Sequence, residues 1–265
     1  MSGPLELQVW QLALGALLIV LNAGISLYAR VGLHGRLLVA AARTVVQLSL
    51  LGLVLKWVFS IEGPWAVLSM MLVMAFIAGF EAVRRTTYRV PGLYRVSIGV
   101  MMISSMLIAF YGLRVVIRVD PWYTPQYAIP ILGMILGNTL NGIALGLETV
   151  LAGFAQRRRQ VEMLLAHGAT AKEASKEIVQ DAVRTGLIPI LNSMAAVGLI
   201  SIPGMMTGQI LAGQAPGSAV RYQMFIMFSI AGGVALGTFS IVLWARRLVF
   251  DDRQRLRHDR IRRKV

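Results

Sequence analysis

The stretch VEMLLAHGATAKEASKEIVQDAVRTG at 161–186, which runs directly into LIPILNSMAAVGLISIPGMMTGQILAG at 187–213, is the key to this chain. The first part is charged and rich in strong helix formers. The second part is apolar enough for hydrocarbon, yet Pro189, Pro203 and several glycines interrupt it. A soluble helical hairpin that continues into a broken membrane helix resembles a lever. We therefore expect a partner to bind the polar part and the membrane part to move.

Composition predicts that the rest of the chain lies in a membrane. Hydrophobic residues make up 57% of the 265 residues, and the mean hydropathy is +0.69, well above a soluble domain. Several apolar runs have about 20 residues, enough to cross roughly 30 Å of hydrocarbon. We expect an all-α, polytopic integral membrane protein with about seven transmembrane helices: Val9–Ala29, Leu37–Phe59, Trp65–Phe80, Val96–Val116, Tyr127–Ala152, Leu187–Leu211 and Tyr222–Trp244. Residues 1–245 would form the transmembrane domain with a cytoplasmic helical coupling segment at 154–186, and 246–265 a basic cytoplasmic tail.

The net charge of +14 is distributed by loop. Basic residues gather after spans 1, 3 and 5 and in the tail, which holds nine, whereas Ser60–Pro64 holds none. This positive-inside pattern places the N-terminus outside and the C-terminus in the cytoplasm of a bacterial inner membrane. No segment resembles a module that reads bases, so we expect no nucleic-acid partner. We expect lipid headgroups to attract part of the tail.

Polar side chains within the apolar spans are costly and therefore carry information. At 100° per residue, three of them on span 5 share an arc of roughly 80°. The six candidates for a pathway or polar gate are Arg43, Gln47, Asn138, Asn141, Glu148 and Asn192. The competing interpretation is that Arg43 snorkels to the interface while the amides tie helices together. A further expectation is that Arg43 and Glu148 are partners.

Glycine spacing predicts both close packing and a helix break. Four GxxxG pairs let helix backbones approach: Gly133/Gly137, Gly142/Gly146, Gly204/Gly208 and Gly233/Gly237. The two pairs on span 5 favour close packing or dimerisation of that helix. In span 6 we expect a kink or break over Pro203, Gly204, Met205, Met206 and Gly208, because proline removes a backbone donor and glycine loosens the turn.

Metal ligands cannot be assigned from the residue types. The chain has no cysteine, and its 14 methionines are either flexible apolar packing or soft thioether ligands of the kind that suits Cu(I). The spans offer little carboxylate or imidazole for a hard iron ion. No HExxH motif, GxSxG motif or Walker A loop occurs. Hydrolysis of ATP, if used, must come from another chain.

The charged segment resembles the EAA loop of ABC importer permeases. Glu162, Gly168 and Ile178 fall at the offsets of that pattern, whereas Met163-Leu164 and Gln180-Asp181 depart from it. Longer stretches resemble the FetB-type family of ABC permeases. They are RTVVQLSLLGLVL at Arg43–Leu55, YRVPGLYR at Tyr88–Arg95, LGMILGNTLNGIALGLE at Leu132–Glu148, and the run His167–Pro216.

The resemblance implies a permease homodimer with two separate ABC ATP-binding subunits. ATP and Mg would be held by those subunits, so this chain would be a transport subunit without a cofactor or enzyme activity of its own. Family members are similar to the membrane half of an iron exporter, which is the sole reason to name iron. The residues expected to couple to the ATPase are Glu162, Gly168, Ala169, Thr170 and Glu173. A loop this long is usually functional, although its charges alone would allow a merely solvated loop.

Two other functional classes remain open from the residues alone. An ion-coupled secondary transporter would use Glu148 as its coupling carboxylate. A non-transporting membrane scaffold would need neither a pathway nor an ATPase. An ATP-binding subunit that associates with the chain separates the permease from both.

Overall fold

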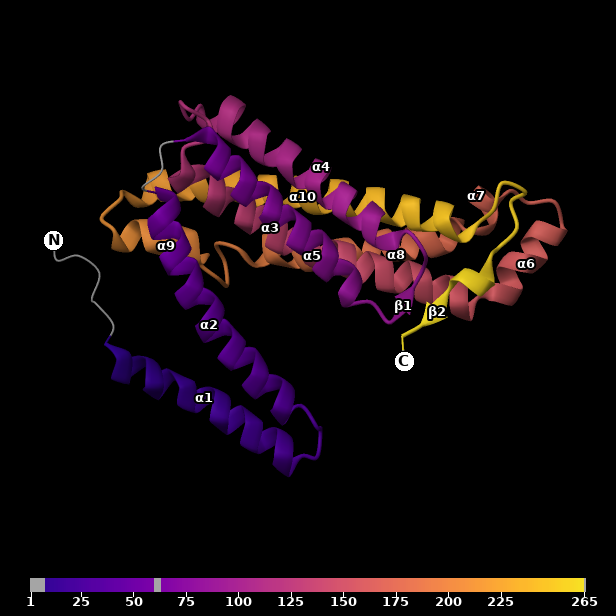
Figure 1. The fold of residues 1–265 in the computed structure, drawn as a ribbon, viewed down its shortest axis with the longest axis horizontal. Coiled ribbons are helices and arrows are strands. Elements are labelled where there is room, and N and C mark those ends of the chain that lie inside the picture. The colour runs from indigo at the N-terminus through magenta and orange to yellow at the C-terminus, as the bar shows by residue number, and fades with distance from the viewer. Residues whose placement is uncertain (1–7, 60–62, 265) are drawn as a thin grey trace. The chain divides into compact units, whose positions relative to one another are not determined.

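The computed structural model describes residues 8–59 and 63–264 and is helical, as the apolar periodicity predicts (Figure 1). The chain divides into two compact units, one of residues 1–62 and 208–214, the other of residues 63–207 and 215–265. Each unit is considered by itself below. Within the described residues, six helices are long and apolar enough to cross a membrane.

The first unit contains a helical hairpin of α1 (Val9–Tyr28) and α2 (His34–Phe59), which pack against each other. Ser26 secures the connecting turn, because its hydroxyl accepts a hydrogen bond from the Leu33 N–H at 3.0 Å and its carbonyl accepts one from the Val31 N–H at 3.1 Å. Most apolar side chains of both helices are exposed, which fits helices that meet lipid. The expected external loop Ser60–Pro64 lies largely outside the described residues.

The second unit is a bundle built around two long helices, α5 (Pro125–Gln156) and α10 (Pro216–Val249). α8 (Lys176–Ala196) packs against both of them. α3 (Pro64–Arg84) and α4 (Leu93–Tyr111) complete the bundle, and a π-helical turn, Gly112–Ile117, extends α4. At 1.5 Å per residue, α5 and α10 are about 48 Å and 51 Å long, which exceeds the hydrocarbon thickness. One end of the bundle therefore extends into water.

Glycines allow α5, α8 and α10 to meet closely. A Cβ atom on Gly186 of α8 would lie 2.7 Å from the Gly142 carbonyl oxygen of α5 and 2.6 Å from Cγ2 of Thr238 on α10. A Cβ atom on Gly237 would lie 2.6 Å from Cγ2 of Thr139. The pairs Gly142/Gly146 and Gly233/Gly237 thus serve packing within one chain, whereas Gly137, Gly204 and Gly208 meet no such neighbour among the described residues.

Span 6 crosses the bundle as a broken segment. It consists of α8, an irregular stretch at 197–203, and α9 (Gly204–Leu211). α8 begins at the hairpin, and the end of α10 returns there, since the Gln254 side chain accepts a bond from the Ala171 N–H at 2.8 Å. From the start of α8 to the start of α10 the chain therefore passes from one end of the bundle to the other, which, added to the six helices of spanning length, supports about seven crossings.

The break covers residues 197–203 and so includes Pro203, whereas the expectation that it extends over Gly204–Gly208 is wrong. Residues 197–203 leave the helix, with Gly198 at φ +82° and its N–H bonded to the Ser201 carbonyl at 3.0 Å. Proline disfavours a helical conformation in the residue before it, so the helix ends upstream. Pro203 then precedes the first turn of α9, where its carbonyl accepts the Thr207 N–H at 3.0 Å. Gly204, Met205, Met206 and Gly208 are helical.

The tail is folded rather than extended. α10 continues to Val249, so the boundary expected at 245 falls inside this helix. The chain then turns back through a short 3-10 turn, His258–Arg260, to β2 (Arg262–Arg263), which pairs antiparallel with β1 (Tyr88–Arg89). Ile261 is buried, and the Phe250 ring lies 5.7 Å from that of Phe154 on α5.

Candidate functional site

A helical hairpin joins α5 to α8 at one end of the bundle. It contains α6 (Arg158–Ala166), the turn Gly168–Thr170 and α7 (Ala171–Ala174). Gly168 has φ +89°, a left-handed conformation that a residue with a Cβ rarely adopts, and the Ala169 N–H bonds back to the Leu164 carbonyl at 3.1 Å. The turn expected at Gly168 is thus present, and it terminates α6.

A reciprocal cap fixes the start of α7. The Thr170 hydroxyl accepts the Glu173 N–H at 3.3 Å, and the Glu173 carboxylate accepts the Thr170 N–H at 2.8 Å. This is the capping box that the sequence Thr-x-x-Glu encodes. The bond from the Thr170 N–H, with a smaller contribution from its hydroxyl, lowers the pKa of Glu173. Two of the expected coupling residues thus hold the turn in shape, while Glu162 pairs with Arg158 at 2.7 Å on α6.

The base of the hairpin is anchored in the bundle. Arg157, at the junction of α5 and α6, forms an ion pair with Asp181 of α8 at 3.1 Å. Ile178 packs so tightly against α5 that a Cβ atom on Gly153 would lie 2.7 Å from its Cγ2 atom. Val161 is also buried. The base of the hairpin is therefore held by both α5 and α8.

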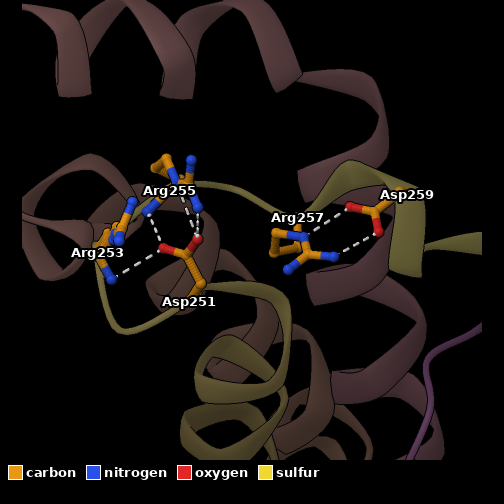
Figure 2. Close-up of polar contacts among 5 residues, drawn as sticks. All are labelled: Asp251, Arg253, Arg255, Arg257 and Asp259. Carbon is orange, nitrogen blue, oxygen red and sulfur yellow. Dashed lines mark hydrogen bonds and ion pairs between the residues drawn. The ribbon is translucent and has the colours of Figure 1, made fainter.

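The folded tail lies beside the coupling turn. Between them is a groove of about 580 Å³ lined by Glu162, Gly168 and Thr170 on one side and by Arg253 and Leu256 on the other. The tail has its own ion pairs: Asp251 with Arg255 at 2.8 Å and Arg257 with Asp259 at 2.9 Å (Figure 2). The expected coupling surface thus has a second component, which the sequence analysis assigned only to lipid.

Two cavities border the helix break at 197–203, and no residue of the hairpin lines either of them. One of about 440 Å³ is lined by four methionines, Met194, Met206, Met224 and Met227, together with apolar residues of α10. The other, of about 570 Å³, contains Asn138, Asn192 and Met205. Both are bordered by Ser201, Pro203 and Gln223. The tertiary structure thus brings two of the six polar candidates to the break.

Gln223 is the main residue that the sequence analysis missed. It is 7% exposed, lines both cavities, and its Oε1 atom has no hydrogen-bond partner within the described chain. A buried acceptor without a partner is costly and therefore needs a reason. A lone amide in the run Tyr222–Phe228, one turn before Met227, is a signal that could have indicated it.

The remaining polar candidates lie elsewhere. Asn141 accepts a hydrogen bond from the Arg85 guanidinium at 3.0 Å, and the Glu148 carboxylate accepts the Thr87 N–H at 2.7 Å. Asn138 and Asn141 are exposed on the surface of this unit and Glu148 is half-buried, so α5 does have the predicted polar face. Arg43 and Gln47 lie on α2 in the other unit, and their pairing with this face stays a prediction.

The described residues offer oxygen and sulfur ligands at the break but no cluster of the usual metal ligands. Within 8–59 and 63–264 there is no group of three or more His, Cys, Asp or Glu residues that could hold a metal ion. The cavities instead present amides, hydroxyls and thioethers. Neutral amide and hydroxyl oxygens and thioether sulfurs differ from the carboxylates that hard cations prefer.

Comparison with known proteins agrees with this architecture. Residues 9–250 match the model of the uncharacterised protein family UPF0014. A UPF0014 membrane protein of Synechocystis is 40% identical over 92% of this chain and 95% of its own length. The probable iron export permease protein FetB of Escherichia coli is 31% identical over 92% of this chain and 93% of its own.

The chain is also similar to a plant protein. The Arabidopsis thaliana protein ALUMINUM SENSITIVE 3 is 32% identical over 85% of this chain and 81% of its own length. No solved structure matches the chain. Together with the six helices of spanning length, these similarities show a multi-pass membrane protein, and the chain belongs to the family UPF0014.

Proposed function

We propose that this chain is the membrane-spanning permease subunit of an ATP-driven ABC transporter that exports a metal ion. The observation that carries the proposal is the hairpin between α5 and α8, anchored by Arg157, Asp181 and Ile178 and exposed at the turn Gly168–Thr170. A compact knob of this kind fits a groove on an ATP-binding subunit. That subunit would hold ATP and Mg and hydrolyse the nucleotide.

The coupling step follows from the packing of α8. Its first half is clamped between α5 and α10 by the contacts of Gly186 with Gly142 and Thr238. Movement of the hairpin therefore shifts this half as a rigid body, and the irregular stretch 197–203 is the part that can change conformation. The change would open and close the cavities bordered by Gln223 and Ser201.

The proposal of a metal substrate comes from the name of a relative and not from a set of metal ligands in this chain. FetB of Escherichia coli is named as a probable iron export permease. The lining of the break supports passage rather than storage, since Asn138, Asn192 and Gln223 supply neutral oxygen atoms. Weak, sequential contacts let an ion enter and leave, as transport requires.

Orientation and assembly complete the proposal. Basic residues in the hairpin and tail support a cytoplasmic position for this end of the bundle in a bacterial inner membrane, with the N-terminus outside. As the family resemblance implies, two copies would form the permease. Because the chain has no cysteine, single introduced cysteines report sidedness directly. A cysteine between Trp122 and Pro125 should react with an impermeant thiol reagent from outside, and one at Thr170 should not. The reverse labelling would overturn the orientation.

The secondary-transporter alternative finds less support. Its coupling carboxylate, Glu148, accepts a hydrogen bond from the Thr87 N–H at 2.7 Å, which ties the carboxylate to a loop.

The decisive experiment tests whether an ABC ATP-binding subunit from the same organism co-purifies with this chain. Gly168→Trp should abolish association and ATPase stimulation while the chain stays inserted, because the indole occupies the tip of the knob. Gly168→Ala controls for the left-handed backbone, and Gly217→Trp places the same bulk where a Cβ meets nothing within 4 Å. Normal coupling by Gly168→Trp, or no association of the unmodified chain, would refute the proposal.

A further inference from the structure

Methionine side chains gather at one of the two cavities beside the helix break. The lining of the cavity of about 440 Å³, the methionine cavity, includes four of them: Met194 on α8, Met206 on α9, and Met224 and Met227 on α10. Met224 and Met227 are three residues apart and therefore lie on one side of their helix. The thioethers thus come from both sides of the stretch 197–203 and from α10.

An unpartnered polar atom lies among these thioethers. Gln223 also lines the methionine cavity, it is buried, and its Oε1 atom has no hydrogen-bond partner within the described chain. A ligand that donates a hydrogen bond or carries a positive charge would satisfy this acceptor. A lipid acyl chain would do neither. Methionines that only fill gaps between helices would not need such an acceptor beside them.

The lining limits which cations fit. Among the described residues that border the two cavities, none carries a charge, and the side-chain oxygen atoms come from amides and hydroxyls. The cost of moving an ion out of water rises with the square of its charge, and without a carboxylate little offsets that cost for a divalent ion. A monovalent cation is therefore favoured. Thioether sulfur is a soft ligand that suits Cu(I), whereas hard cations prefer carboxylates.

Two residues connect the methionine cavity to its neighbour. Gln223 and Met227 line both cavities, and they share one face of α10 because they are four residues apart. The neighbouring cavity of about 570 Å³ has two further methionines, Met134 and Met205. An ion that moves from one cavity to the other would therefore keep thioethers and the Gln223 amide within its surroundings.

We propose that the methionine cavity is a binding site for a soft monovalent cation of the Cu(I) and Ag(I) class. The thioethers supply its ligands, and Gln223 Oε1 faces its positive charge. This inference deepens the proposed function and rests on it for one statement, that the cation is the transported substrate. Binding itself requires no ATP-binding subunit, so it is measured on this chain alone.

The test measures the dissociation constant of Ag(I) for the full chain in nanodiscs of neutral lipid. Ag(I) is the probe because it shares the soft chemistry of Cu(I) and needs no reductant to keep it monovalent. The buffer contains no chloride and the chain no histidine tag, since both would bind the ion. We expect saturable binding, and X-ray absorption at the silver edge should show sulfur atoms next to the ion.

Methionine-to-leucine substitutions test the ligands. A chain with Met206→Leu, Met224→Leu and Met227→Leu should have a dissociation constant about tenfold higher or more, because leucine has a similar volume but offers no sulfur. The matched control carries three such substitutions at half-buried methionines outside both cavities and should stay within about twofold of the unmodified chain. Its substitutions are Met70→Leu, Met102→Leu and Met106→Leu.

Substitutions of Gln223 test the oxygen atom. Gln223→Leu should raise the dissociation constant several-fold, because it removes the acceptor that faces the cation. Gln223→Glu keeps an oxygen atom and adds a negative charge, so it should bind Ag(I) at least as tightly as the unmodified chain. Unchanged thermal unfolding of each variant without silver excludes a folding defect.

The outcomes separate this site from the proposed function. Equal effects of the two triple variants, or no saturable binding of Ag(I), would overturn the site, and an ATP-binding subunit that still co-purifies would keep the permease assignment. Binding of Mn(II) or Fe(II) that depends on Asn138 and Asn192 but not on the methionines would overturn the soft-cation class and keep metal transport. Expected silver binding by a chain that associates with no ATP-binding subunit would keep the site and overturn the permease assignment.

Discussion

The two halves of the segment Lys176–Pro203 contrast in how they are held. In the half up to Gly186, Ile178, Ala182, Val183 and Gly186 are buried against α5 or α10. In the half from Leu187, most side chains are exposed, and the helix ends at Ala196. The first half behaves as a rigid extension of the hairpin, because its contacts leave no room for rotation. The second half borders cavities and can change conformation at low cost.

In the proposed transport cycle, this difference would let one helix both transmit the movement of the hairpin and change conformation beyond its packed half. A helix packed tightly along its whole length could move only together with the rest of the bundle. A helix without contacts along its length would not pass the movement of the hairpin to the bundle. The boundary between the two regimes lies near Pro189, which is inside α8 and lacks a backbone donor. Four measurements test whether the two halves of this segment differ in this way.

Glycine-to-alanine substitutions compare the two halves directly. Gly186→Ala should destabilise the chain by about 1–3 kcal/mol, because its methyl group overlaps the Gly142 carbonyl and the rigid neighbours must shift. Gly204→Ala, beyond the break, should be neutral or stabilising by up to about 1 kcal/mol, since alanine favours helix and nothing lies within 4 Å. Unfolding in detergent measures both. Equal effects would mean that α8 is not clamped.

Substitutions of Glu148 on α5 measure how much its hydrogen bond with Thr87 stabilises the packed part of the bundle. Glu148→Leu should cost about 1–3 kcal/mol of stability, because the Thr87 N–H loses its acceptor. Glu148→Gln should retain most of the stability, as its amide oxygen can still accept. Combining Glu148→Leu with Arg43→Ala in a double-mutant cycle tests the predicted pair, and strictly additive losses would eliminate it.

Substitution of Gln223 tests the cavities that border the helix break. Gln223→Leu should leave stability unchanged or raise it by about 1 kcal/mol, because it removes a buried acceptor without a partner. The same variant should lower transport in proteoliposomes if the amide contacts the substrate. Ser229→Ala on the same helix is the control, since its hydroxyl already bonds to the Phe225 carbonyl at 2.9 Å and its loss should not affect transport. A Gln223→Leu chain that transports normally would remove Gln223 from the pathway.

The smallest effect concerns pH at the coupling turn. The pKa of Glu173 is lowered by the Thr170 hydrogen bonds, so the folded turn favours the carboxylate. Its contribution is therefore present above the ordinary glutamate pKa of about 4.3 and is lost as pH falls through the lowered value. Amide exchange at Thr170–Glu173, corrected for intrinsic rates, should be constant from about pH 7 to 5 and accelerate below about 4. Glu173→Gln should remove this dependence, and an acceleration that persists in it would exclude Glu173 as the cause.

Features that depend on neighbouring residues could be predicted from the sequence. Apolar runs gave the spans, because the length needed to cross hydrocarbon is a local property. The capping box of Thr170 with Glu173 and the glycine turn at Gly168 follow equally from short spacing. Pro203 indicates a break in span 6. The break lies on the N-terminal side of Gly204 and not after it, because proline constrains the residue that precedes it.

Which faces of the helices meet depends on the tertiary structure. Periodicity predicts that Asn138, Asn141 and Glu148 lie on one side of α5. It does not predict that Asn138 borders a cavity or that Glu148 accepts a hydrogen bond from the Thr87 N–H. Gly186 is unremarkable in the sequence, and Gln223 is marked only as a lone amide in an apolar run. Their roles come from close contact with other helices for Gly186 and from the lack of a partner among the described residues for Gln223. The Gln254 bond to Ala171 spans 83 residues. Local spacing specifies the direction in which a side chain projects, whereas packing between distant segments determines what that side chain meets.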